Sequence, residues 1–203
     1  ITKLLFAHEG AQTSEISSLD DFIELLQLHL AFAGLAPSSA SVLAPAIAAA
    51  TGVGQVIFFS GKMATRIARQ CAIACSSSNA LELRIPVGEV APGVIEFGLQ
   101  NLAASPPETL SSLVVEGINR SPIDVIGGDL FDYVLDQKLG SGPSHANYLV
   151  FATLVDGPSS LPVDESYLAL GPIFDTALLD WKFSGARDLD ATLPGSIDTA
   201  NWI

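Results

Sequence analysis

The sequence predicts an α+β fold in which one mixed β-sheet packs against several helices. Two apolar runs of strand length, residues 54–60 and 148–155, are bounded by glycine, proline or aspartate, as buried strands are. Apolar residues at helical spacing occupy other segments, most clearly residues 19–32 and 128–139. Helices and strands do not alternate strictly, so we expect one mixed sheet rather than a doubly wound one. The pattern leaves open whether residues 54–60 pair in parallel with a later strand.

The first quarter of the chain predicts one strand and two helices. Residues 2–8 have the composition of a strand. Ser18 is placed to cap a helix over residues 19–32, whose first turn is acidic. An alanine-rich helix is expected over residues 37–50, with Pro45 as a kink or break inside it.

Shorter elements follow the strand predicted at residues 54–60. Turn residues separate them, and their boundaries follow from changes in apolar spacing. In chain order we predict a helix over residues 62–71, a hairpin of strands 81–87 and 94–99, a helix over 106–119, a helix over 128–139, a strand over 148–155 and a short strand over 167–170.

We predict a single globular domain over residues 1–183 and an extended C-terminal arm over residues 184–203. The arm has no apolar periodicity and contains glycine and proline, which disfavour a helix. It also carries large apolar residues, which disordered tails lack, so we expect these to make subunit contacts. The expected contact residues are Leu189, Leu193, Trp202 and Ile203.

The charge of the chain disfavours direct binding of nucleic acid. The 203 residues include 22 acidic and 9 basic side chains, which gives a formal net charge of −13. Nucleic-acid binding depends on clustered cations that neutralise phosphates, and this chain has no arm rich in lysine or arginine. No membrane span is expected either, because the apolar runs fall well short of the ~20 residues that a spanning helix needs.

The composition favours protein partners. Charged residues make up 15% of the chain, and the mean hydropathy is +0.44. A monomer with so few charges would expose wide apolar patches, which are typical of protein interfaces. We therefore expect the partners to be copies of the chain itself or other subunits of an assembly.

The cysteines and histidines do not form a recognisable metal or catalytic motif. Cys71 and Cys75 stand four residues apart in a predicted helix, a spacing that gives poor disulfide geometry. Two free thiols indicate an intracellular, reducing compartment, or a particle assembled there. His8, His29 and His145 lack metal-ligand spacing, so we expect no metal and no cofactor.

The turn after the strand at residues 54–60 is the candidate binding site. Ser60, Gly61 and Lys62 join this strand to a helix start, where free N–H groups and a lysine form a generic anion site. The glycines of this segment are too far apart for a P-loop, so nucleotide hydrolysis is not indicated.

A basic stripe continues from this turn. Arg66 and Arg69 follow Lys62 at helical spacing. We interpret the stripe as a face that is solvated or paired with acidic neighbours, and recognition of a partner's acidic surface is the alternative.

Residues 74–78 read Ala-Cys-Ser-Ser-Ser, a run similar to the nucleophile segment of β-ketoacyl synthases. The resemblance implies a reactive thiol at Cys75, held at a helix start. That family also needs downstream histidines, whereas His145 alone follows Cys75 and its neighbours do not match. We therefore interpret the serines as a turn.

The leading functional hypothesis is a structural subunit of a large particle, such as a viral capsid, a shell or a surface layer. It depends on the low charge, the high hydropathy and the lack of a catalytic motif, with extensive apolar subunit contacts as the mode of action. Two alternatives stay open. One is an enzyme, a hydrolase or transferase, with an anion-binding turn at Ser60, Gly61 and Lys62; the other is a module that binds a small molecule or a peptide.

Overall fold

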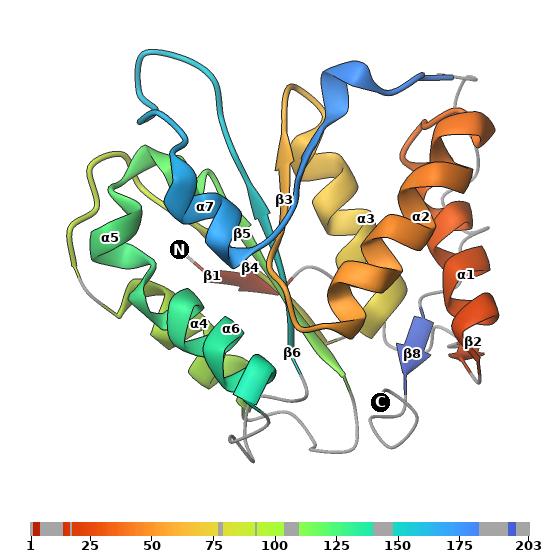
Figure 1. The fold of residues 1–203 in the computed structure, drawn as a ribbon, viewed down its shortest axis with the longest axis horizontal. Helices are drawn as coiled ribbons and strands as arrows, with labels where there is room; N and C mark the ends of the chain where they lie inside the picture. Colours follow the sequence, from red (N-terminus) through yellow and green to blue (C-terminus); the bar gives the residue numbers. More distant parts are fainter. Residues whose placement is uncertain are drawn as a thin grey trace.

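A six-stranded sheet forms the centre of the fold (Figure 1). The computed structural model describes residues 2–4, 14–16, 18–76, 79–91, 93–103, 110–139, 148–182 and 195–197. From one edge to the other, the sheet consists of β1 (Thr2–Leu4), β4 (Ala80–Arg84), β5 (Ser111–Glu116), β6 (Tyr148–Thr153), β3 (Ile57–Ser60) and β7 (Ile173–Asp175). Two further strands, β2 (Ser14–Ile16) and β8 (Gly195–Ile197), form a separate parallel pair.

Five neighbouring strands of the large sheet, from β4 to β7, run parallel, and β1 is antiparallel to β4 at the edge. Parallel strands are usually covered on both faces and are then apolar along their whole length. In β3, Ile57, Phe58 and Phe59 are fully buried. The six residues of β6 are all buried as well.

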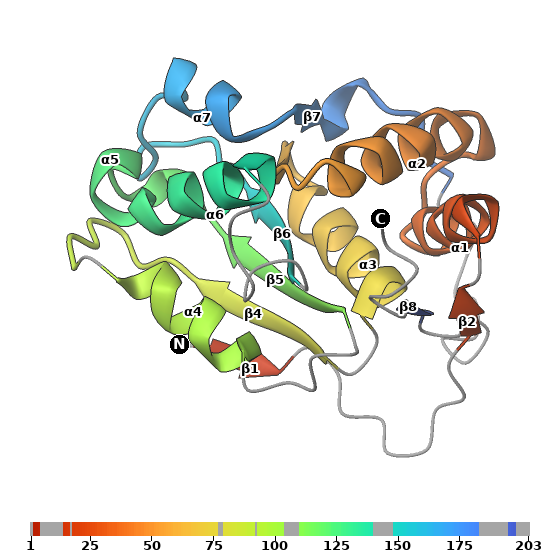
Figure 2. The ribbon, with the colours of Figure 1, turned by 60° about the horizontal axis from the view of Figure 1, so that its bottom comes forward.

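Helices cover both faces of this sheet, which gives three layers (Figure 2). On one face lie α1 (Leu19–Phe32), α2 (Pro37–Gly52) and α3 (Ala64–Ser76). On the other lie α4 (Val94–Ala103), α5 (Ile123–Ile126), α6 (Gly128–Leu139) and α7 (Glu165–Leu170). Single 3₁₀ turns occupy Ile118–Arg120 and Thr176–Leu178.

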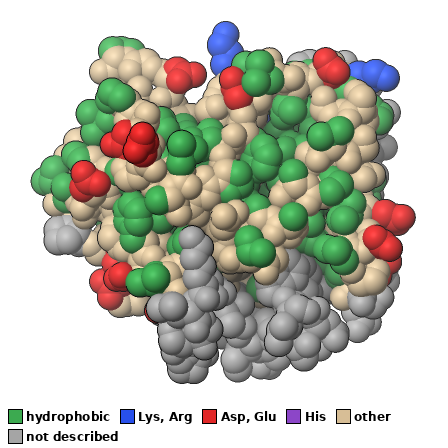
Figure 3. Space-filling model, in the orientation of Figure 1, with side chains coloured by type: hydrophobic (Ala, Val, Ile, Leu, Met, Phe, Trp, Pro, Cys, Tyr) green, Lys and Arg blue, Asp and Glu red, His purple; other side chains and the backbone are tan. Residues whose placement is uncertain are grey.

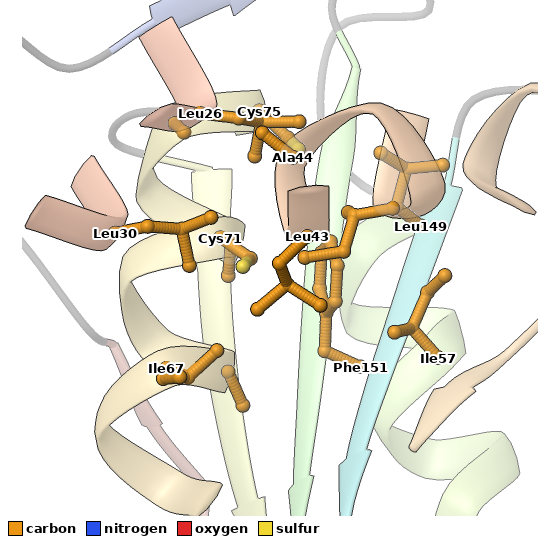
Figure 4. Close-up of a cluster of buried hydrophobic side chains, with 14 of the residues drawn as sticks. Leu26, Leu30, Leu43, Ala44, Ile57, Ile67, Cys71, Cys75, Leu149 and Phe151 are labelled. Atoms are coloured by element: carbon orange, nitrogen blue, oxygen red, sulfur yellow. The ribbon is translucent and has the colours of Figure 1, made fainter. Parts of the chain in front are cut away.

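Each face of the sheet has its own apolar core. Under α1 to α3, Leu30, Leu43, Cys71 and Phe151 pack together, as Figure 4 shows. Under α4 to α7, the ring of Phe58 meets the ring of Tyr167 edge-on, with 5.7 Å between their centroids. The two cores cover many of the apolar residues of this chain. None of the described helices is long and apolar enough to cross a bilayer.

The predicted fold class is confirmed at its coarse level, because the chain forms a mixed sheet packed against several helices. The arrangement in detail is α/β, since five strands are parallel and helices lie on both faces. The parallel pairing that was left open for residues 54–60 is confirmed, because β3 pairs in parallel with both β6 and β7.

Three predicted elements are wrong. Residues 94–99 belong to the helix α4, where Ile95, Leu99 and Leu102 face the core at helical spacing. A helix was predicted over residues 106–119, but Ser111–Glu116 within that range form the strand β5. Residues 167–170, predicted as a short strand, belong to the helix α7. The first error removes the predicted hairpin, since β4 is followed by a helix.

Other predicted elements agree with the structure. The hydroxyl of Ser18 accepts a hydrogen bond from the Asp21 N–H at 3.1 Å, so it caps α1 as predicted. The alanine-rich helix is also present as α2, but it continues through Pro45, so the break that was one alternative there is not observed.

The predicted arm differs from the expectation at one described segment. Residues 184–194 and 198–203 lie outside the described residues, and β8 is a regular strand where no regular element was expected.

Candidate functional site

The predicted Ser60–Lys62 turn lies at the carboxyl edge of the parallel sheet, where the chain changes sides. From β3 the chain enters α3 on one face of the sheet, whereas from β6 it runs to α7 on the other face. Because β3 and β6 are neighbours, their outgoing connections diverge at this point. Open α/β sheets bind their ligands at such a switch point, and binding of an anion at this turn stays a prediction.

The turn itself is packed against the segment that follows β7. Gly61 has a positive φ of 88°, and a Cβ at that position would lie 2.7 Å from the Thr176 hydroxyl and 3.3 Å from a carboxylate oxygen of Asp175. The Thr176 hydroxyl donates a hydrogen bond to the Ser60 carbonyl at 2.7 Å. A carboxylate beside the turn repels an anion, so Asp175 weakens the expected anion site.

The three residues of the predicted basic stripe have different surroundings. Lys62 is exposed and precedes α3, which begins at Ala64. Arg66 points to the end of α1, where its guanidinium lies 3.5 Å from the Phe32 carbonyl oxygen, as a cation at a helix C-terminus often does. Arg69 pairs with acidic residues of the sheet, as the interpretation of a face paired with acidic neighbours expects for this residue.

Arg69 belongs to a group of four charged side chains that connects α3 with β4 and β5. Its guanidinium contacts Glu82 at 2.5 Å and Glu116 at 3.9 Å. Glu116 also lies 3.8 Å from Arg84. The side chain of Glu82 is only 7% exposed, and removal of its arginine partner would leave a buried carboxylate without compensation.

Glu82 lies close enough to Glu116 to affect the ionisation of the Glu116 carboxyl. Burial raises the pKa of the Glu116 carboxyl, and its hydrogen bond with Glu82 raises it further, against the opposing effect of Arg84 and Arg69. A raised carboxyl pKa beside a second carboxylate is common at catalytic sites, but it also occurs in structural ion-pair networks. Here the contacts with both arginines favour a role in holding α3 against the sheet.

The cysteines are enclosed in the core. Both thiols are free, and burial raises the pKa of Cys71 and of Cys75 well above the ordinary value for a thiol. Such thiols are poor nucleophiles, so the interpretation of the Cys75 run as something other than a catalytic segment agrees with its surroundings. His29 is buried, and its Nδ1 lies 2.9 Å from the Gln70 side-chain oxygen.

Several predicted residues cannot be placed. His8, His145 and the predicted contact residues Leu189, Leu193, Trp202 and Ile203 lie outside the described residues. Within the described part of the chain, no three His, Cys, Asp or Glu side chains are grouped so that they could hold a metal ion.

Sequence reasoning missed the residues that contact the Ser60 turn and those that form the charged group around Arg69. Asp175 and Thr176 contact the Ser60 turn although more than a hundred residues separate them from it in the sequence, and no local sequence pattern predicts this contact. Glu82 and Arg84 had a signal, because they alternate with apolar residues in a strand and therefore share one face of it.

The comparisons with known proteins concern the whole chain rather than this edge of the sheet. No protein-family model matches the chain. It is similar to a protein of Escherichia coli (strain UMEA 4076-1). That protein is Druantia protein DruC. The two are 31% identical over 188 residues, which is 92% of this chain but 29% of the length of DruC.

This similarity corrects the leading functional hypothesis. A capsid, shell or surface-layer subunit was expected from the low charge and the high hydropathy, and that expectation is wrong. The apolar composition has another physical reason, because two buried cores, one on each face of the sheet, contain many of the apolar residues that the structure describes.

Proposed function

We propose that this chain is a DruC-like α/β segment that serves a bacterial anti-phage defence system of the Druantia kind. The observation that carries the proposal is the 31% identity to DruC, which extends over 92% of the chain. Similarity over this length supports a shared fold of the whole segment rather than a shared short motif. Because the chain spans 29% of DruC, the proposed role is that of one part of a larger protein.

Within such a system we propose that the segment binds protein partners. Large apolar side chains are exposed on the outer helices, for example Phe97 on α4 at 57% and Leu135 on α6 at 53%. A net charge of −13 disfavours contact with nucleic acid and favours a positively charged partner.

A segment exchange tests the proposal. In cells that carry the Druantia system of E. coli, the matching segment of DruC is replaced by this chain, and phage resistance is measured by the efficiency of plating. We expect the exchanged DruC to protect the cells, and DruC without the segment to give no protection.

Two results would contradict the proposal. Full protection by DruC without the segment would mean that the segment is not needed for defence. The second result is loss of protection although the exchanged DruC is expressed at the normal level and its inserted segment melts as the isolated chain does. It would mean that the similarity does not extend to function.

A further inference from the structure

The outer layer formed by α4, α5, α6 and α7 exposes large apolar side chains on each of its helices. Phe97 on α4 is 57% exposed and Leu135 on α6 is 53% exposed. On α5 and α7, Val125 and Leu168 are exposed as well. Single exposed apolar residues are ordinary, and the layer of α1 to α3 exposes some as well, so the choice of this layer as a docking surface depends on its charge.

The same layer is strongly acidic. Its four helices contain one basic residue, Lys138, in α6. Figure 3 shows acidic side chains over the part of the surface formed by α5, α6 and α7, while the lysine and arginine side chains seen in this view lie at the upper rim. The acidic residues within the helices or at their caps are Glu96, Asp124, Asp129, Asp132, Asp136, Asp164 and Glu165.

Some of these carboxylates are crowded together. A carboxylate oxygen of Asp129 accepts a hydrogen bond from the Glu96 N–H at 3.1 Å, which joins the first turns of α4 and α6. Burial raises the pKa of Asp129, and the nearby charges of Glu96 and Asp132 raise it further. A cation brought to this place would relieve the repulsion between like charges.

A second pair of carboxylates comes from α5 and from the cap of α7, and both affect the buried Tyr167. Burial raises the pKa of Tyr167 to about 12, and the negative charges of Asp164 and Asp124 also contribute. Asp164 caps α7, and Asp124 lies in the first turn of α5, so both helices bring an acidic residue to the same ring. Val125 and Leu168 belong to these two helices, which places apolar and acidic side chains on the same elements.

We propose that the layer of α4 to α7 is a docking surface for a positively charged amphipathic segment of another protein. Phe97 and Leu135 would contact the apolar side chains of that segment, and Asp124 and Asp132 would pair with its lysines and arginines. Acidic and apolar groups on one layer complement a basic amphipathic helix, which buries its apolar face and keeps its cations at the rim. This inference names the partner chemistry of the protein-binding role proposed above, and it rests on that role.

A binding assay with a model peptide tests this surface without phage. The probe is a fluorescein-labelled helical peptide made of leucine and lysine, and binding to the purified chain is followed by fluorescence anisotropy. The test variant combines Phe97→Ser, Asp124→Asn and Asp132→Asn. The matched control combines Leu28→Ser, Asp20→Asn and Glu24→Gln on α1, which removes the same number of charges and one exposed apolar side chain.

We expect saturable binding that the test variant weakens by about tenfold or more, as loss of hot-spot contacts does, while the control variant binds almost as well as the wild type. Raising the salt concentration should weaken binding, because screening shortens the reach of charges. A peptide with glutamate in place of lysine should not bind. Thermal melting of both variants shows that each remains folded at the assay temperature.

Three results would overturn the proposal. Equal weakening by both variants would assign the attraction to net charge rather than to this surface, and absence of saturable binding at low salt would exclude the surface. Salt-sensitive self-association of the chain that the test variant abolishes would show that a second copy covers the layer instead. Loss of phage protection in the segment exchange, with peptide binding intact, would refute the proposed function and leave the docking surface in place.

Discussion

Replacing Gly171 with alanine should destabilise the fold through a single backbone contact. Gly171 links α7 to β7, and its φ of 163° is extended backbone that any residue can adopt. A Cβ there would lie 1.9 Å from the Val56 carbonyl oxygen. This is roughly 1.5 Å short of an ordinary contact, and the obstacle is backbone that cannot rotate away.

The cost follows from what must move. The Val56 N–H donates to the Leu170 carbonyl at 3.1 Å, and the Phe58 N–H donates to the Pro172 carbonyl at 2.9 Å, so the clash separates β7 from β3 at both bonds. Overpacking usually costs about 1–3 kcal/mol, and a backbone clash belongs at the upper end of that range or beyond it. For a chain of this length, a loss of about 3 kcal/mol lowers the melting temperature by roughly 6–12 °C.

The assay is thermal unfolding followed by circular dichroism, with Gly52→Ala as the matched control. Gly52 is the last residue of α2, and a Cβ at that position meets no atom within 4 Å. We expect the control to melt at the wild-type temperature or slightly above it, since alanine restricts the unfolded chain and favours a helix. If Gly171→Ala melts together with the control, the close approach of Gly171 and Val56 is not a feature of the folded protein.

Three further predictions concern buried polar groups. Tyr133→Phe removes the hydrogen bond that the Tyr133 hydroxyl donates to the Tyr148 carbonyl at 2.7 Å, and it should cost about 1–3 kcal/mol in urea unfolding, whereas an unchanged midpoint would refute a role for this bond. Because the pKa of Glu116 is raised in the folded state, this group favours folding at low pH and loses that effect as the pH rises through its folded pKa. The difference between the melting temperatures of Glu116→Gln and the wild type should therefore increase with pH, and a difference that decreases with pH would contradict this prediction. Cys71 and Cys75 should react with Ellman's reagent only at the rate of unfolding, and fast reaction of the native chain would contradict their burial.

The elements that the sequence predicted correctly have strong local signals. Helix α1 has a serine cap, an acidic first turn and clear apolar spacing, and β6 is an unbroken apolar run before a turn. Residues 94–99 were too short a window to distinguish a strand from the start of α4, whose spacing becomes clear only when Leu102 is included. In β5 the consecutive apolar residues Leu113, Val114 and Val115 face both cores, so no alternation marked the strand.

The candidate sites show the same limit. The turn at Ser60 to Lys62 could be found from the sequence because a strand, a glycine and a helix start are adjacent there. Its acidic neighbour Asp175 could not be found, since the contact depends on β7 lying beside β3. Likewise, the carboxylates of α4 to α7 look like ordinary solvated residues until the topology gathers these helices on one face of the sheet.

The pairing of β2 with β8 has a consequence for the order in which the protein folds. Ser14 lies opposite Gly195, so this pair closes almost the whole chain into a loop, and contacts between residues so distant in sequence form slowly. The last strand of the large sheet in chain order is β7, which ends at Asp175. On the ribosome, where synthesis proceeds at about 5–20 residues per second, the six-stranded sheet can therefore assemble before β8 emerges. The strand β2 pairs with β8 only after the end of this segment has been translated.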